Sequence, residues 1–287
     1  MIALKVLIIY FSQTGGTEKI AKAIQQGILE SGNACDLVEI KASASKDLKN
    51  YDLVGVGCPT FYYREPLNVR NFIQQMDDAQ GKHCFIFCTH GSSKGNTFYY
   101  LKEDLSQKGF VVIGAFDSYA ESSLQFYPKP MHTAKHPDAF ELEAAKKFGS
   151  EMCERSSRIQ QGELNLIPAI ELVEDTWWAK DSKMMTPELL RKMTPVLKIN
   201  SEKCTQCLTC QDNCPVDAID IANQEIQKEG CIFCWFCEKS CPERAIEADW
   251  ALMQNWAKQN LKRYIKILAD AESKGEFRPY VDYRKII

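Results

Sequence analysis

The sequence has no hydrophobic run long enough to cross a membrane, since its N-terminal apolar stretch from Val6 to Phe11 has only the length of a β-strand. We therefore expect no signal peptide and no membrane partner. It also lacks the G-x-x-x-x-G-K-[ST] pattern, and no G-x-G-x-x-G follows a strand, so nucleoside triphosphate and nicotinamide sites are not indicated. No Ser/His/Asp or Cys/His set stands out as catalytic machinery, and a net charge of −3 disfavours nucleic acid as a partner.

Cysteine, by contrast, is abundant, with 13 in a chain of 287 residues. A secreted protein with this many cysteines in disulfides is expected to be short and to carry a signal peptide. The length favours two domains, and the cysteines are expected to be thiols or metal ligands in a reducing cytoplasm.

Eight cysteines form two runs with the same spacing, C-x2-C-x2-C-x3-C-P, displaced by 27 residues. The first run holds Cys204, Cys207, Cys210 and Cys214, and the second holds Cys231, Cys234, Cys237 and Cys241. Other residues recur at the same offset, including Ile199 with Ile226 and Ile219 with Ile246. The sequence therefore predicts a duplicated structural unit.

Three thiolates at positions i, i+3 and i+6 favour an iron–sulfur cubane, whereas zinc sites use two close pairs of ligands. Two structural zinc sites are the alternative, which iron and acid-labile sulfide analysis would separate. At these residues, roughly 196 to 248, the chain resembles a bacterial ferredoxin, a small α+β domain with two [4Fe-4S] clusters. In such proteins the fourth cysteine of each run ligates the other cluster. The resemblance thus implies cluster I on Cys204, Cys207, Cys210 and Cys241, and cluster II on Cys231, Cys234, Cys237 and Cys214.

The residues between the cysteines differ in the two runs. Cluster I has polar neighbours such as Thr205 and Gln206, whereas cluster II has Phe233, Trp235 and Phe236. We predict that cluster II is the drier one and faces another domain or subunit. The alternative is that these aromatic residues fill a very small core.

At the other end, a buried strand, a loop and a helix follow one another from residue 4 to residue 30. The loop is made of glycine, hydroxyl and amide residues: Ser12, Gln13, Thr14, Gly15, Gly16 and Thr17. Backbone N–H groups, hydroxyls and the helix N-terminus together form a phosphate cradle without lysine. The alternative is a helix cap without a ligand.

Strand-like and helical segments alternate along the first half of the chain. The strands are expected at 4–11, 35–40, 53–58, 84–89 and 110–116, with helices at 18–30, 66–76, 97–107 and 138–155. This alternation predicts a doubly wound α/β fold with a five-stranded parallel sheet, whose ligands bind at the carboxyl ends of the strands.

Residues 1 to about 158 resemble a flavodoxin, because the family's [ST]-x-T-G-x-T loop for the FMN phosphate is matched in full by residues 12–17. The resemblance implies FMN as cofactor and two further loops that hold its isoalloxazine ring. The first ring loop would use Pro59, Thr60, Phe61, Tyr62 and Tyr63, and the second Thr89, His90, Gly91, Gly95 and Asn96. Loops without any ligand are the alternative at these two places.

The domains are therefore expected as a flavodoxin-like domain at 1–160, a structured linker at 161–195, a ferredoxin domain at 196–248 and a helical tail at 249–287. Trp177 and Trp178 lie in the linker, where packing between domains or docking against a redox centre would explain them.

FMN exchanges one or two electrons and a [4Fe-4S] cluster only one, so the chain is expected to pass low-potential electrons between FMN, the clusters and a redox partner protein. The whole arrangement resembles flavodoxin and ferredoxin fusions of anaerobes. A corrinoid or other metalloprotein that needs reductive activation is one hypothetical acceptor. An FMN-dependent reductase of a quinone or nitro compound, fed by the clusters, is the rival hypothesis. A binding module with a vestigial flavodoxin domain is disfavoured by the intact phosphate loop.

Charge is distributed unevenly, with −5 over residues 204–248 and +2 over the rest. An acidic ferredoxin face could steer a basic protein partner. The residues leave open whether flavin and clusters meet within one subunit or across a homodimer.

Overall fold

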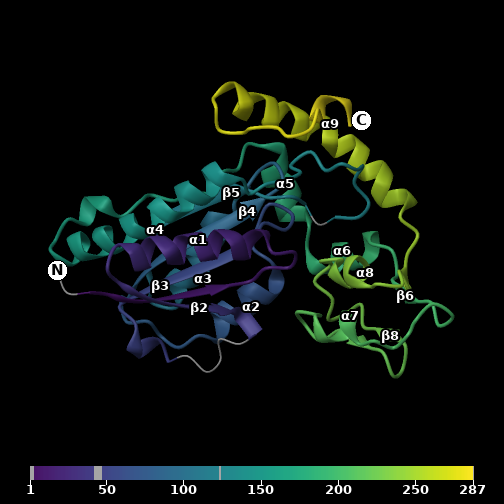
Figure 1. The fold of residues 1–287 in the computed structure, drawn as a ribbon, viewed down its shortest axis with the longest axis horizontal. Coiled ribbons are helices and arrows are strands. Elements are labelled where there is room, and N and C mark those ends of the chain that lie inside the picture. The colour runs from purple at the N-terminus through teal and green to yellow at the C-terminus, as the bar shows by residue number, and fades with distance from the viewer. Residues whose placement is uncertain (1–2, 42–46, 123, 287) are drawn as a thin grey trace. The chain divides into compact units, whose positions relative to one another are not determined.

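The computed structural model describes residues 3–41, 47–122 and 124–286 (Figure 1). The chain divides into two compact units. The first comprises Met1–Glu121 and Lys135–Ser182, and the second comprises Ser122–Ala134 and Lys183–Ile287. A loop within the N-terminal half of the sequence thus belongs to the same unit as the cysteine repeat.

The first unit is built on a parallel sheet of five strands in the order β2-β1-β3-β4-β5, as predicted. Its strands are β1 (Lys5–Tyr10), β2 (Ala34–Glu39), β3 (Leu53–Pro59), β4 (His83–His90) and β5 (Val111–Tyr119). The central strands β1, β3 and β4 are almost entirely buried, which explains why they read as continuous apolar runs.

Helices α1 and α4 contact each other, and so do α2 and α3, in keeping with a doubly wound fold. Their bounds are α1 (Gly16–Glu30), α2 (Leu67–Gln75), α3 (Thr97–Gln107) and α4 (Ala139–Gln160). Glycines allow α1 and α4 to pack closely, since a Cβ on Gly27 would overlap the backbone carbonyl of Lys146. This contact and the apolar face of Ile20, Ile24 and Ile28 fix α1 on the sheet.

The cysteine repeat folds as two small antiparallel sheets that exchange strands between its halves. β6 (Lys198–Ile199) pairs with β9 (Ile246–Glu247), and β7 (Ile219–Asp220) pairs with β8 (Glu225–Ile226). Each sheet therefore joins the opening strand of one repeat to the closing strand of the other. The two halves cannot form their sheets independently, which makes the repeat one domain.

Backbone geometry repeats with the same 27-residue offset. Left-handed φ angles occur at Gln206, Leu208 and Asp217 and again at Phe233, Trp235 and Arg244. The short helices α7 (Thr209–Asp212) and α8 (Phe236–Ser240) follow these turns at corresponding places. The predicted duplication is thus present in conformation as well as in sequence.

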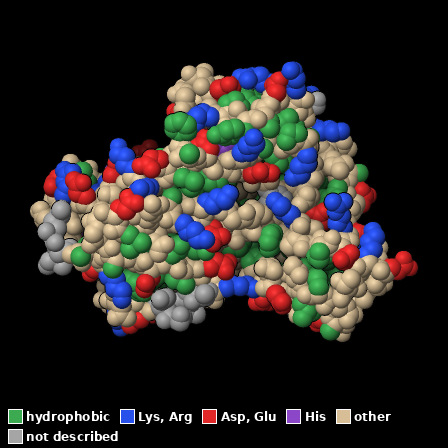
Figure 2. All heavy atoms as spheres, in the orientation of Figure 1, with side chains coloured by type: hydrophobic (Ala, Val, Ile, Leu, Met, Phe, Trp, Pro, Cys, Tyr) green, Lys and Arg blue, Asp and Glu red, His purple; other side chains and the backbone are tan. Residues whose placement is uncertain are grey.

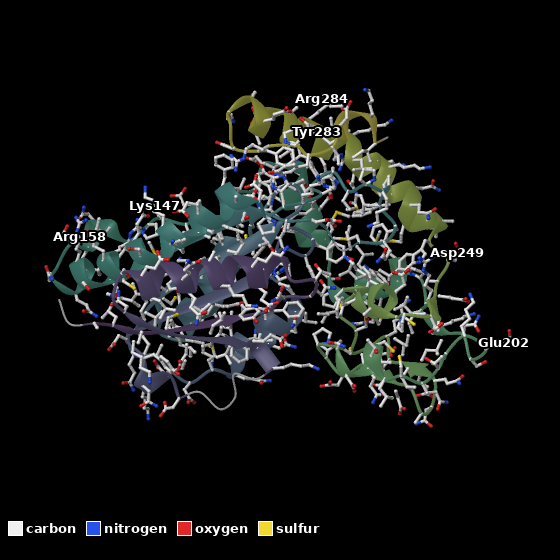
Figure 3. All side chains as sticks on the ribbon, in the orientation of Figure 1. Lys147, Arg158, Glu202, Asp249, Tyr283 and Arg284 are labelled. Carbon is white, nitrogen blue, oxygen red and sulfur yellow. The ribbon has the colours of Figure 1, made fainter. Side chains whose placement is uncertain are left out.

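Apart from a 3-10 turn between β2 and β3, the remaining elements lie in the linker and the C-terminal region. They are the helices α5 (Trp177–Met184), α6 (Pro187–Met193) and α9 (Ala251–Ser273), with 3-10 turns at Leu48–Asn50, Leu164–Leu166 and Tyr283–Lys285. The last turn lies against α9, where Tyr283 and Arg284 both bond the Glu272 carboxylate (Figure 3). Among the described residues, no helix is both long and apolar enough to span a membrane.

Candidate functional site

The loop between β1 and α1 places backbone donors at one edge of the sheet. Gly15 is the N-cap of α1 with a φ of 85°, a conformation that glycine adopts without strain. It offers no side chain to the first-turn amides, although Ser12 Oγ accepts a hydrogen bond from the Glu18 amide at 3.2 Å. Gln13 and Thr14 form the bend between them. A helix start whose N-cap is glycine and whose neighbours carry hydroxyls suits a phosphate group.

Thr17 connects this loop to the end of β4. Its hydroxyl lies 2.8 Å from that of Thr89, and both side chains are buried. Gly16 approaches the end of β5, because a Cβ there would lie 3.1 Å from Cβ of Ala120. The predicted phosphate loop and the second ring loop therefore meet at the same edge of the sheet.

The first ring loop contains a tight turn of unusual composition. Phe61 and Arg64 exchange two backbone hydrogen bonds of 2.9 and 3.1 Å, and the turn residues Tyr62 and Tyr63 have φ angles of 51° and 66°. Two left-handed residues in succession form a turn that favours Asn and Gly, so bulky tyrosines are strained in it. Such strain concentrates at functional sites, where the surroundings enforce it.

The two ring loops contact each other at Tyr63. The amide of Asn96 donates to the Tyr63 carbonyl at 2.9 Å, and the amide of Thr60 donates to the carbonyl of Thr89 at 2.8 Å. Gly95 has a φ of 57°, and a Cβ on it would come within 2.5 Å of the Tyr63 carbonyl oxygen. Glycine is therefore required at position 95 for the loops to pack as they do.

The linker supplies a third segment at this site; docking of its tryptophans against a redox centre was one of the two hypotheses from the sequence. The Asn96 side chain donates to the Val173 carbonyl at 2.9 Å and accepts from the Val173 amide at 3.1 Å. Trp177 packs edge-on against Tyr63 with ring centroids 5.4 Å apart, and Trp178 lies beside it. The tandem tryptophans thus support the strained turn, and their size and adjacency were the only signal in the sequence.

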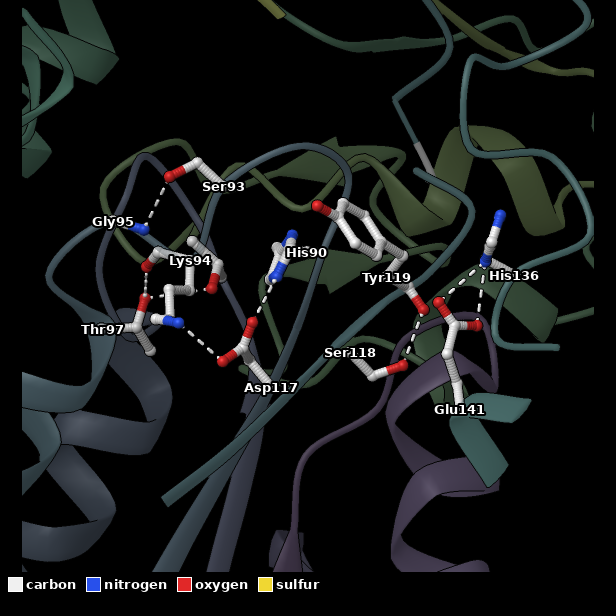
Figure 4. Close-up of polar contacts among 11 residues, drawn as sticks. His90, Ser93, Lys94, Gly95, Thr97, Asp117, Ser118, Tyr119, His136 and Glu141 are labelled. Carbon is white, nitrogen blue, oxygen red and sulfur yellow. Dashed lines mark hydrogen bonds and ion pairs between the residues drawn. The ribbon is translucent and has the colours of Figure 1, made fainter. Parts of the chain in front are cut away.

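A charged network lies below the second ring loop (Figure 4). The buried His90 ring bonds Asp117 through Nε2 at 3.0 Å, and Lys94 bonds the other Asp117 oxygen at 2.7 Å. Burial alone would raise the pKa of Asp117, but the bond and charge of His90 and the charge of Lys94 outweigh it and hold the pKa well below its usual range. Ser93 accepts from the Gly95 amide, so the loop that begins at Gly91 is anchored at both ends.

In the second unit, one hollow is lined by four of the eight repeat cysteines. They are Cys204, Cys207, Cys210 and Cys241, and the hollow encloses about 310 Å³ including the part open to solvent. Cys241 comes from the second run, yet it faces three cysteines of the first. The structure thus brings together the set predicted for cluster I.

The other four cysteines also lie near one another. Burial raises the pKa of Cys237, with further contributions from the charges of Cys234, Cys231 and Cys214, and burial raises the pKa of Cys234 to about 12. Thiolates in so dry a place need a compensating positive charge, which iron supplies. In both runs the sulfur of the last cysteine accepts a backbone bond of 3.2 Å, from Ala218 to Cys214 and from Ala245 to Cys241.

Comparison with known proteins agrees with the two predicted kinds of domain. Residues 8–130 match the family model "Flavodoxin", and residues 196–256 match "4Fe-4S dicluster domain". The chain joins a flavodoxin domain to a 4Fe-4S dicluster domain. It is an electron-transfer flavo-iron-sulfur protein, with FMN and iron–sulfur clusters as its cofactors.

Similar proteins cover the flavodoxin domain. A flavodoxin of Clostridium beijerinckii is 29% identical over 109 residues, which are 37% of this chain and 79% of the relative. An uncharacterised protein of Methanocaldococcus jannaschii is 28% identical over 149 residues, 50% of this chain and 95% of the relative. Among solved structures, an archaeal flavodoxin is 21% identical with a TM-score of 0.42, covering 54% of this chain and 99% of its own.

Each cofactor supplies the electron chemistry, and the protein binds, orients and shelters it. In the flavodoxin domain the residues around Gly15 and Thr17 suit the FMN phosphate. The strained tyrosine turn and the loop from Thr89 to Asn96 would offer aromatic faces and backbone groups to the ring. In the dicluster domain the two thiol sets suit one cluster each.

Proposed function

We propose that this protein relays electrons between an external redox protein and FMN, with cluster I exchanging electrons with the partner and cluster II passing them between cluster I and the flavin. The proposal rests on a contrast between equivalent positions of the repeat. Leu208 in the first run is 42% exposed, whereas Trp235, its counterpart in the second, is 2% exposed. Cys207 is also exposed, so cluster I has the shorter path to a partner at the surface.

An aromatic shell covers the second run. Trp235 packs edge-on against Trp250 at 5.0 Å between centroids, and Phe126 stacks on Trp250 at 5.6 Å. These residues come from three separate parts of the sequence within the second unit. Such a shell excludes water from cluster II, which favours internal transfer over exchange with solvent-borne partners.

In the sequence, Ala120 and Phe126 are only six residues apart. Ala120 lies beside Gly16 of the phosphate loop in the first unit, and Phe126 belongs to the aromatic shell in the second. A corrinoid or other metalloprotein that is reduced at low potential is the acceptor class that we propose to test first.

The acidic excess of the dicluster domain favours a basic partner. Glu243 lines the cluster I hollow and is exposed, and Asp212 and Asp217 are exposed nearby in sequence. The face drawn in Figure 2 shows acidic and basic side chains intermixed, so charge is not segregated there. We expect the attraction of a basic partner to act locally, at the opening of the hollow that the cluster I cysteines line.

Glu243→Lys is expected to slow the oxidation of the reduced clusters by a cationic complex such as hexaammineruthenium(III), roughly threefold at low salt. Oxidation by anionic ferricyanide should accelerate, and high salt should abolish both effects. Glu225→Lys is the matched control, because Glu225 is exposed on β8 and does not line the hollow. Stopped-flow absorbance measures these rates, and equal responses of the two variants would contradict exchange at cluster I.

A further inference from the structure

Buried polar atoms without hydrogen-bond partners gather beside α2 and α3, on residues that are not themselves assigned to a cofactor. Among the described side chains they include Arg64 Nε, Glu65 Oε2, both amide atoms of Asn68 and Asp104 Oδ2. Unpaired polar atoms are costly in a dry interior and rare in folded proteins. Water molecules that bridge these groups are the ordinary way to satisfy them.

The negative charge of Glu65 is not enough to neutralise the two arginines that bond it. Its carboxylate is fully buried, and Arg64 and Arg70 both bond the same oxygen, at 3.0 and 2.6 Å. Arg64 also lies over the ring of Tyr100 on α3, 4.0 Å from the centroid. Two guanidinium groups against one carboxylate leave a single positive charge, which Asp104 can neutralise.

Asp104 is the group whose protonation can change here. Burial raises the pKa of Asp104 to about 6, and the negative charge of Glu65 adds to this, against the opposing charges of Arg70 and Arg64. Glu103, its neighbour on α3, acts in the same direction as Glu65. Near neutral pH a modest change in the local field is therefore enough to protonate or deprotonate this carboxyl.

The cluster adjoins both loops of the flavin ring. Arg64 closes the strained turn of the first ring loop by its backbone bonds to Phe61. Helix α3 begins at Thr97, whose hydroxyl lies 3.0 Å from that of Thr60 in the same loop. Asp104 lies seven residues further along α3, about 10 Å at the helical rise. For comparison, one charge added about 10 Å from a carboxyl, at an effective dielectric constant of about 20, shifts its pKa by roughly one unit.

We propose that Asp104 is a proton-storage residue that takes up a proton when the FMN of the flavodoxin domain is reduced. Each electron that reaches the flavin adds one negative charge unless a proton follows it. The Asp104 carboxylate would then accept a proton from solvent and form an O–H bond, which leaves one net positive charge on the group of Arg64, Arg70 and Glu65. On oxidation the proton returns to solvent. The proposal rests on the assignment of FMN to this domain and on nothing in the order of the clusters.

Spectroelectrochemical titration of the FMN across pH tests this, because the slope of midpoint potential against pH counts protons per electron. Between about pH 6 and pH 7, reduction of the flavin in the natural protein should be accompanied by the uptake of roughly half a proton per flavin, in addition to any proton that binds the ring itself. The Asp104→Asn variant should bind as much FMN as the natural protein but should not take up this additional half proton. Asp77→Asn, an exposed neutralisation after α2, should keep it.

Glu65→Gln is a second test variant. Because the charge of Glu65 raises the pKa of Asp104, its removal should move the additional proton uptake to lower pH. A slope in Asp104→Asn identical to that of the natural protein would overturn the proposal, as would the same loss in Asp77→Asn. A failed relay between clusters and flavin would leave this titration unchanged, so the two proposals are tested separately.

Discussion

Replacing Cys241 with serine is expected to remove the cluster held by the first cysteine run, although Cys241 belongs to the second. The reason is geometric, because Cys241 lines the same hollow as Cys204, Cys207 and Cys210. A serine hydroxyl is a poor substitute for a thiolate ligand to iron. Iron and sulfide analysis of the variant should show about four iron atoms per chain, compared with about eight in the intact protein.

Double variants show whether each cluster takes its fourth cysteine from the other run or from its own. Cys204→Ser combined with Cys241→Ser should lose no more iron than either change alone, because both residues serve one cluster. Cys231→Ser combined with Cys241→Ser should lose both clusters. The opposite pattern would show that each run binds its own cluster. Cys35→Ser is the control, since Cys35 is a half-buried thiol of the flavodoxin domain and its loss should leave the iron content unchanged.

Gly95→Ala is expected to weaken FMN binding at least tenfold. A β-carbon there would overlap the backbone of Tyr63, so the two ring loops must separate, and alanine is also strained at a φ of 57°. A loss of about 1.4 kcal/mol in binding free energy corresponds to this factor. Fluorescence titration of the apoprotein with FMN measures the dissociation constant.

Gly81→Ala separates the overlap from the backbone strain. Gly81 has a φ of 84° in a turn after α2, and nothing lies within 4 Å of the place where its Cβ would be. This variant should lose roughly 1 kcal/mol of folding stability and bind FMN as the natural protein does. Equal affinities of the two variants would show that contact between the ring loops does not control the flavin site.

Local periodicity and spacing were enough to predict much of this architecture. The alternation of strands and helices gave the five-stranded parallel sheet, since each central strand is an apolar run buried on both faces. The offset of 27 residues predicted the duplicated unit, and the two halves do pair with each other, Ile199 with Ile246 and Ile219 with Ile226. These features depend on residues that are close in sequence or on an exact repeat.

Contacts between segments that are far apart in the sequence could not be predicted from periodicity and spacing. Nothing in the sequence shows that Tyr62 and Tyr63 adopt left-handed angles, because that conformation is enforced by Gly95 and Trp177 from elsewhere in the chain. The membership of Phe126 in the shell of cluster II is equally hidden, since its loop lies within the stretch that resembles a flavodoxin. The roles of the individual flavin-ring residues stay predictions.

The relay between clusters and flavin is tested most directly by anaerobic rapid mixing with a limiting amount of a one-electron donor such as reduced methyl viologen. Cluster and flavin absorbance are followed together over a wide range of protein concentration. The account predicts that the clusters are reduced first, and that the flavin is then reduced as they reoxidise, at a rate independent of protein concentration. Clusters that stay reduced beside an oxidised flavin, or fast turnover of a quinone or nitro compound that persists in Cys241→Ser, would contradict it.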